Sequence, residues 1–275
     1  MAKIKLEPNS DRIYKEFPVD SGTDDPAKPT FVRQYSILAD GMICPDQKGG
    51  TCGLYALAAI MRKARGCGFR ATPLDDFSSQ GITNVDPTLI EVALSSGYSK
   101  MGEMFNPEHI KVLYDQFLPQ GSGVRLNCTV QNVTDQTRFS EIVEDTIKRH
   151  GVLMVPFSID GEGNVICVNC VGKQEAVDAA HWGIIIGYDQ VWISSRSEIS
   201  AYHVVHWGRL WTYHSGCLAN SNLMMPSGLQ AKLAWDPKRE DDQKLKAALE
   251  KKGTRDWSAE SSPCELGAKL IAFKP

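Results

Sequence analysis

The hydrophobic and polar positions follow different periods in the two halves of the chain. Between residues 52 and 150 the apolar residues fall at helical spacing, in blocks that end at Gly, Pro or Ser. From residue 152 onward they form short continuous runs, such as VLMVPF over 152–157, which are typical of buried strands. Helices that precede strands predict an α+β fold in which a helical part packs on an antiparallel sheet.

The helical blocks have recognisable ends. Cys52 begins the first, which runs to about Arg65 because Gly66 and Gly68 follow it. Further helices are predicted over residues 88–94, 107–118 and 141–150, the last with Ser140 as its N-cap. Strands are predicted at residues 152–157, 183–188, 191–193, 202–205 and 270–273.

The two ends of the chain differ from its middle. Residues 1–40 are polar, with prolines at positions 8, 18, 26 and 29, which predicts an irregular lead-in. Residues 236–253 mix both charges at helical spacing and predict a surface helix. We therefore expect a lead-in over residues 1–40 and a single domain over residues 41–275.

Composition excludes several classes of function. The 275 residues are 42% apolar and 23% charged, with a net charge of -3, so we expect no bulk affinity for nucleic acid or membranes. No apolar run approaches the roughly 18 residues that span a bilayer, and the first residues lack the apolar core of a secretion signal. These observations predict a cytoplasmic protein.

The chain has eight cysteines, which we expect to be mostly reduced in that compartment. Cys167 and Cys170 have the spacing of zinc ligands or of a redox pair. A structural zinc usually requires a second such pair, and the sequence has none. We therefore predict no metal and expect this pair to lie in a loop or hairpin.

Cys52 stands between the glycine-rich stretch QKGGT and a helix, which makes it a candidate nucleophile. The first turn of a helix offers unpaired N–H groups and the positive end of the dipole, and both favour a thiolate. Gln47, five residues earlier, is a candidate donor to an oxyanion, together with the N–H of Cys52. An exposed loop glutamine is the plainer interpretation of Gln47.

A nucleophilic cysteine requires a base, and His181 has the most favourable context of the six histidines. It directly precedes an apolar run, so we expect it at the mouth of a buried strand, where a cysteine on a helix can face it across a cleft. His206 repeats the tripeptide His-Trp-Gly and is the rival base. The third residue that would orient the imidazole stays unassigned among the candidates Asp189, Asn220 and Asn222.

Another segment, GEMF over residues 102–105, has a carboxylate beside two large apolar side chains between two predicted helices. It either lines a substrate cleft or is a loop packed into the core.

Four segments together resemble one family. They are QKGGTCGLYALAAI over 47–60, GYSKMGEMF over 97–105, AHW over 180–182 and SNL over 221–223. The chain resembles the actin maturation proteases, which are papain-like cysteine peptidases related to the bacteriocin-processing peptidases. The first and third segments are shared with many cysteine hydrolases, whereas the second and fourth point to this family.

The resemblance implies a papain-like fold and an aminopeptidase without a cofactor. Its members remove an N-terminal, usually acetylated, residue from immature actin, so the actin N-terminus becomes the expected substrate. Carried over by residue, Cys52 is the nucleophile, His181 the base and Gln47 the oxyanion donor. Vertebrate members have a proline-rich N-terminal part suited to profilin, but residues 1–40 contain no polyproline run, so we expect no profilin contact.

Two alternatives stay open. Another papain-like thiol hydrolase, such as a deamidase or a processing peptidase, would use the same pair of residues. A non-catalytic binding module on the same fold would keep Cys52 as an ordinary thiol.

Overall fold

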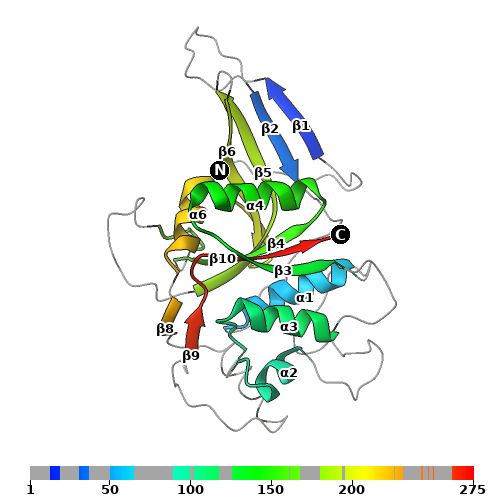
Figure 1. The fold of residues 1–275 in the computed structure, drawn as a ribbon, viewed down its shortest axis with the longest axis vertical. Coiled ribbons are helices and arrows are strands. Elements are labelled where there is room, and N and C mark those ends of the chain that lie inside the picture. The colour runs from blue at the N-terminus through cyan, green and yellow to red at the C-terminus, as the bar shows by residue number, and fades with distance from the viewer. Residues whose placement is uncertain are drawn as a thin grey trace.

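A computed structural model describes residues 13–18, 31–36, 50–64, 89–99, 102–117, 126–160, 162–167, 180–193, 196–225, 227–231, 243, 247, 250 and 262–275. Within them the fold is α+β, with an antiparallel sheet between two layers of helices (Figure 1).

The main sheet contains eight strands, and each described pairing in it is antiparallel. The strands are β1 (Ile13–Pro18), β2 (Phe31–Ser36), β3 (Asn127–Asn132), β4 (Val152–Ser158), β5 (Ala180–Ile193), β6 (Arg196–His206), β7 (Arg209–His214) and β10 (Lys269–Lys274). Two further strands, β8 (Ser227–Ala231) and β9 (Ser262–Glu265), pair with each other.

Strand β5 is the centre of this arrangement. Along one edge it pairs first with β4, through residues 180–185, and then with β2, through residues 187–192. Its other edge pairs with β6, which turns back into β7. The other edge of β4 pairs with β10, which is the last strand of the chain and so belongs to the same sheet.

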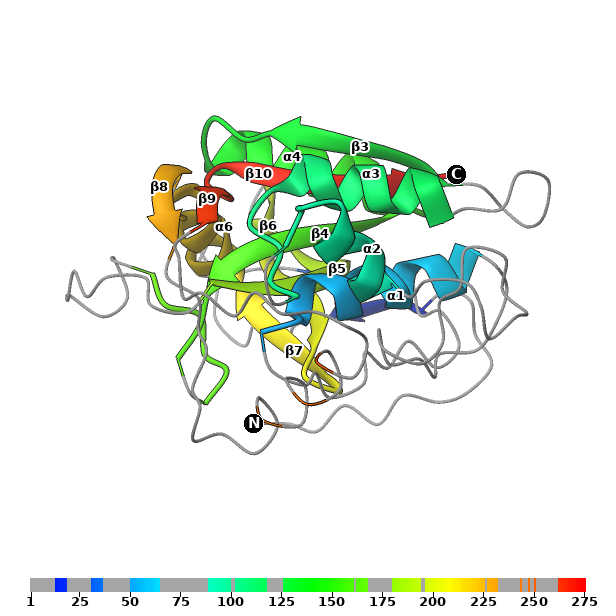
Figure 2. The same cartoon turned by 90° about the horizontal axis from the view of Figure 1, so that it is seen from below.

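Helices cover both faces of the sheet, as the two views show (Figures 1 and 2). One layer holds α1 (Cys52–Ala64), α2 (Leu89–Ser95) and α3 (Pro107–Phe117), and the other holds α4 (Gln136–Lys148) and α6 (Ser215–Leu223). Side chains alternate along a strand. Accordingly Met154 of β4 packs in the cluster with α1 and α3, and Val155 packs in the cluster with α4 and α6.

The first three predicted helices are confirmed to within about a residue at each end. The start of the fourth was predicted wrongly, because α4 begins at Gln136 rather than at Glu141. Its N-cap is Asp135, whose side chain accepts the N–H of Arg138 at 2.8 Å. Ser140 instead forms a 2.8 Å hydrogen bond with the hydroxyl of Tyr202.

The strand predictions at residues 152–157 and 270–273 are confirmed as β4 and β10. The runs 183–188 and 191–193 belong to one strand, β5, which β6 follows along its length despite two shifts of register. Within the predicted irregular lead-in, the structure has β1 and β2. The prediction of an irregular lead-in is therefore wrong there: β2 pairs with β1 along one edge and with the distant β5 along the other.

Residues 243, 247 and 250 are helical and exposed, and the rest of segment 236–253 lies outside the described residues. Among the helices that the structure describes, none is long and apolar enough to cross a lipid bilayer.

Candidate active site

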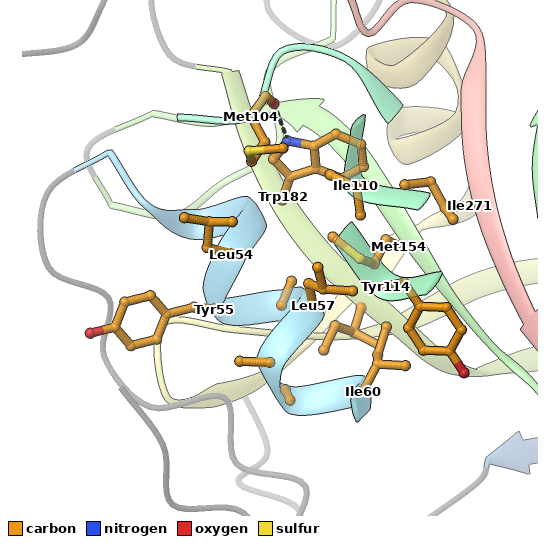
Figure 3. Close-up of a cluster of buried hydrophobic side chains, with 14 of the residues drawn as sticks. Leu54, Tyr55, Leu57, Ile60, Met104, Ile110, Tyr114, Met154, Trp182 and Ile271 are labelled. Carbon is orange, nitrogen blue, oxygen red and sulfur yellow. Dashed lines mark hydrogen bonds between the residues drawn. The ribbon is translucent and has the colours of Figure 1, made fainter. Parts of the chain in front are cut away.

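Cys52 is the first residue of α1 and lies at the end of the sheet where β5 begins. The carbonyl of Thr51 accepts the N–H of Tyr55 at 3.0 Å and closes the first turn of the helix. The apolar residues that follow, from Leu54 to Met61, are buried in the cluster shown in Figure 3. This burial fixes the helix and holds Cys52 itself at 7% exposure.

The thiol of Cys52 is neutral in this structure. Burial and, to a smaller extent, the negative charge of Glu103 raise its pKa from 9.0 to about 12. The N–H groups of Cys52 and Gly53 lower the pKa, as expected at a helix N-terminus. That effect is real but smaller than desolvation, so the expectation of a favoured thiolate fails for this state of the protein.

Segment 102–105 packs directly against the turn that carries Cys52. A Cβ atom added to Gly50 would lie 2.4 Å from the Glu103 carboxylate, and one added to Gly53 would lie 2.9 Å from Cβ of Met104. Gly102 has φ +105°, and a Cβ there would lie 2.5 Å from Cγ2 of Thr51. Glycine is therefore required on both sides of this contact, and the two segments singled out in the sequence are in fact neighbours.

Trp182 joins both segments to β5. Its indole Nε1–H donates a 2.7 Å hydrogen bond to the carbonyl of Met104 (Figure 3). Its backbone N–H donates to the thiol of Cys52 and lowers the pKa of that group. Because this N–H belongs to the peptide between residues 181 and 182, the sulfur lies beside the backbone of His181.

The imidazole of His181 faces the other side of β5. It lies in an aromatic group that consists of Phe157, His181, His206, Trp207, Trp211 and Tyr213. Trp182 packs with α1, and side chains alternate along a strand, so the ring of His181 points toward the opposite layer. The structure thus brings the sulfur of Cys52 to the backbone beside His181, but among the described interactions no hydrogen bond joins the thiol to the imidazole.

His181 is neutral in this setting. Its side chain is buried, and burial, followed by the nearby His206, holds its pKa well below 6.5. The Nε2 atom is buried without a hydrogen-bond partner. A neutral imidazole retains one lone pair, which is what a general base requires.

His206, the rival base, lies next to His181, with 4.8 Å between the ring centroids. Its Nε2 forms a 2.5 Å hydrogen bond with the hydroxyl of Tyr213, which also donates to the carbonyl of Gly163 at 2.6 Å. Burial lowers the pKa of His206 to about 4. His206 therefore belongs to the same group of side chains as His181 and does not form a separate candidate site.

The three candidates for the orienting residue all have other partners. Asp189 bonds to His203 at 2.9 Å, eight residues along β5 from His181. Asn220 accepts a hydrogen bond from Gln136. Asn222 is fully buried and donates from Nδ2 to the carbonyls of Pro156 and Lys269, both at 2.9 Å, so it ties α6 to β4 and β10. Gln47 lies outside the described residues.

The cysteines other than Cys52 take no described part in this site. Cys128, Cys217 and Cys264 form no disulfide bond, which agrees with the expectation that most cysteines are reduced, whereas Cys167 is disulfide-bonded. Cys170 lies outside the described residues. No three described His, Cys, Asp or Glu side chains are grouped so as to hold a metal ion.

Comparison with known families adds an independent observation. A family model described as actin maturation protease-like, C-terminal domain, matches residues 44–189, which is more than half of the chain. The chain belongs to the actin maturation protease-like family. No curated protein matches it.

The match to the actin maturation protease-like model includes Cys52, segment 102–105 and His181. It ends before His206 and before the Ser-Asn pair of α6. The sequence motifs therefore identified the residues that meet at the start of β5: Cys52, segment 102–105 and His181. It missed the hydrogen bonds of Trp182 and Tyr213, and the one hint to the aromatic group was the repeated His-Trp-Gly tripeptide.

Proposed function

We propose that this actin maturation protease-like protein is a papain-like cysteine aminopeptidase that removes the N-terminal residue of immature actin. The observation that carries the proposal is the contact of three segments at one place: the turn before α1, segment 102–105 and the start of β5. All three lie within the family match. A packing role alone does not require a thiol at the point where they meet.

In the proposed reaction Cys52 and His181 start as a neutral pair. The imidazole of His181 then turns toward the sulfur. A rotation of the side chain is enough in this proposal, because the sulfur already lies beside the backbone of His181. The imidazole takes the thiol proton as Sγ forms a bond to the carbonyl carbon of the first actin residue. The N–H of Cys52 and the amide of Gln47 stabilise the oxyanion.

The second half of the reaction returns the proton. Protonated His181 gives it to the leaving amine as the carbon–nitrogen bond breaks, which leaves a thioester on Cys52. His181 then draws a proton from water, whose oxygen attacks the thioester. The carbon–sulfur bond breaks, the removed residue leaves with a free carboxyl group, and His181 returns the proton to the sulfur of Cys52. Since a buried neutral thiol is a poor nucleophile, this mechanism needs proton transfer to occur together with attack.

The test is to incubate the protein with a peptide of the acetylated actin N-terminus and follow its mass. We expect the loss of one N-terminal residue with wild type, and no loss with Cys52→Ala. Cys217→Ala is the matched control, because Cys217 also forms no disulfide bond but is more exposed, and it should retain full activity. Equal cleavage by Cys52→Ala and wild type would reject the proposal.

One observation favours a second candidate, a non-catalytic binding module. The thiol of Cys52 is buried, has a raised pKa and does not bond to His181 among the described interactions. In that case no peptide is cleaved, blocked or unblocked, while the protein binds the actin peptide with equal affinity before and after Cys52→Ala.

A further inference from the structure

The imidazole of His181 is enclosed on the side of β5 that faces away from Cys52. The ring of Phe157, its partner on β4, lies edge-on at 5.6 Å between centroids, and the rings of His206 and Trp207 lie at 4.8 and 5.1 Å. The side chain of His181 is only 3% exposed. While the imidazole occupies this position it cannot take a proton from the thiol, so the proposed reaction requires it to leave.

The enclosed position does not satisfy the polar atoms of the ring. Nε2 of His181 is buried there without a hydrogen-bond partner, and so is Nδ1 of His206. A buried polar atom that has lost its water and gained no partner costs free energy, whereas edge-to-face contacts between rings are favourable. Aromatic packing therefore holds the imidazole against a polar cost, and the loss of one packing ring should shift the imidazole toward other rotamers.

Trp207 is the ring of this enclosure that is least tied to the rest of the fold. It lies in the turn between β6 and β7, whereas Phe157 and His206 lie in strands. Its side chain is half-buried, whereas those of Phe157 and His206 are at most 1% exposed. The indole can therefore move without breaking a strand pairing.

The backbone of Trp207 is strained in a way that favours such a movement. Trp207 has φ +47° and Gly208 has φ +65°, as in a type I′ hairpin turn, where Asn-Gly is a preferred pair. A tryptophan rarely adopts this conformation, and such strain persists only where surrounding contacts hold it. Here the indole packs on both imidazoles, at 5.1 Å from His181 and 5.3 Å from His206. The contact that supports the strained turn is thus the contact that encloses His181.

We propose that Trp207 is a positioning residue that holds the imidazole of His181 away from Cys52, and that displacement of the indole lets the imidazole turn to the sulfur. After this turn the thiol proton passes from Sγ to the imidazole nitrogen that faces it, which gives a thiolate and an imidazolium without any further reactant. This inference rests on the proposed function for its catalytic meaning, but the position of the ring and its effect on the thiol are independent of any substrate. Trp207 lies outside the family match.

Two substitutions separate the contact with His181 from general packing. Trp207→Asn removes the indole and suits the turn, because asparagine tolerates a positive φ and is preferred there. Trp211→Ala is the matched control, because Trp211 is also half-buried in the aromatic group but its described ring contacts do not include His181. We expect iodoacetamide to alkylate Cys52 at pH 7 at least about tenfold faster in Trp207→Asn than in wild type, and within about twofold of wild type in Trp211→Ala.

The acceleration must depend on the imidazole. In the double variant Trp207→Asn with His181→Ala, we expect the alkylation rate of Cys52 to fall back to that of His181→Ala alone, because no imidazole can then take the thiol proton. Acceleration that survives the loss of the imidazole would mean that the substitution merely exposes the sulfur. Equal rates in Trp207→Asn and wild type would mean that the indole does not restrain the ring. Either result overturns the inference.

A titration of wild-type protein, followed in ¹⁵N spectra of labelled histidine, tests the inference even if Trp207→Asn does not fold. In the enclosed position burial and the nearby His206 hold the pKa of His181 well below 6.5, so its signals at pH 6 should be those of a neutral ring. Wild-type His181 that titrates at pH 6.5 or above would overturn the inference. If neither wild type nor Trp207→Asn cleaves the actin peptide, the peptidase proposal fails, and the alkylation rates and the titration still decide on the role of the indole.

Discussion

Trp182 donates from its indole to the carbonyl of Met104 at 2.7 Å, across 78 residues of sequence. Both residues are at 2% exposure, so this bond is shielded from water. It connects the start of β5 to segment 102–105, which in turn packs on the turn before Cys52. Trp182 thereby holds the position of segment 102–105 relative to the thiol.

Trp182→Phe should remove this bond while keeping an aromatic ring. The carbonyl of Met104 would be left buried without its donor, so we expect the free energy of unfolding to fall by about 1–3 kcal/mol. Urea denaturation measures the change. Trp211→Phe is the control, since its indole bond to the carbonyl of His206 is longer, at 3.3 Å, and only partly buried, and it should cost less.

Gly102→Ala and Gly97→Ala form a matched pair for the glycine contact. Both glycines have positive φ, at +105° and +69°, but a Cβ at Gly97 would meet nothing within 4 Å. We expect about 1 kcal/mol of destabilisation at Gly97 from backbone conformation alone, and a loss more than twice as large at Gly102. Equal losses would mean that Thr51 can move away without cost.

Asn222→Ala should reveal a structural role for that residue. It would leave two strand carbonyls, those of Pro156 and Lys269, without a donor, and we expect a loss of about 2–4 kcal/mol. Asn220→Ala, whose partner Gln136 is exposed, should cost under about 1 kcal/mol. A variant at position 222 that keeps full stability but loses activity would instead support a catalytic asparagine.

The raised pKa of Cys52 predicts slow alkylation at neutral pH. Below a pKa of about 12 the thiolate fraction rises about tenfold per pH unit, so the alkylation rate should rise without a plateau between pH 7 and 10. Glu103→Gln removes a negative charge that raises this pKa and should increase the rate. A plateau near pH 7 in mass-resolved labelling would show that the thiol is already activated.

The pKa of His206 predicts a stability that depends on pH. Between pH 6.5 and about 4 the unfolded chain binds a proton on His206 that the folded protein does not, so the free energy of unfolding falls as pH falls. The slope is about 1.4 kcal/mol per pH unit for this one proton. His206→Gln should flatten the dependence between pH 6 and pH 5 by that amount, whereas His214→Gln, at an exposed position, should not.

Local pattern was enough to predict much of the fold. Gly, Pro and cap residues bounded α1, α2 and α3, and apolar runs located β4, β5 and β10. The pattern failed where partners are distant. Residues 31–36 become a strand by pairing with the distant β5, and residues 13–18 by pairing with residues 31–36. The side chain of Asp135 caps α4, so Ser140 lies inside the helix, where its hydroxyl bonds to Tyr202.

The site was predicted in the same uneven way. Cys52 and His181 come from local context, and the family match includes both. The alternation of β5 that turns His181 and Trp182 to opposite faces depends on where the strand starts and on its register with β4, in which Phe157 pairs with His181. The bond between His206 and Tyr213 depends on the β6–β7 hairpin and is invisible in a linear sequence.

The position of β5 between three partner strands makes the site sensitive to parity. Insertion of a single residue between Ala180 and His181 would exchange the imidazole and the indole between the two sides of the sheet, because side chains alternate between the two faces along a strand. A two-residue change would preserve the facing and only displace the pair along the strand. Natural variants of this protein can therefore lengthen or shorten β5 near its start only by an even number of residues if the thiol of Cys52 is to keep the same neighbours.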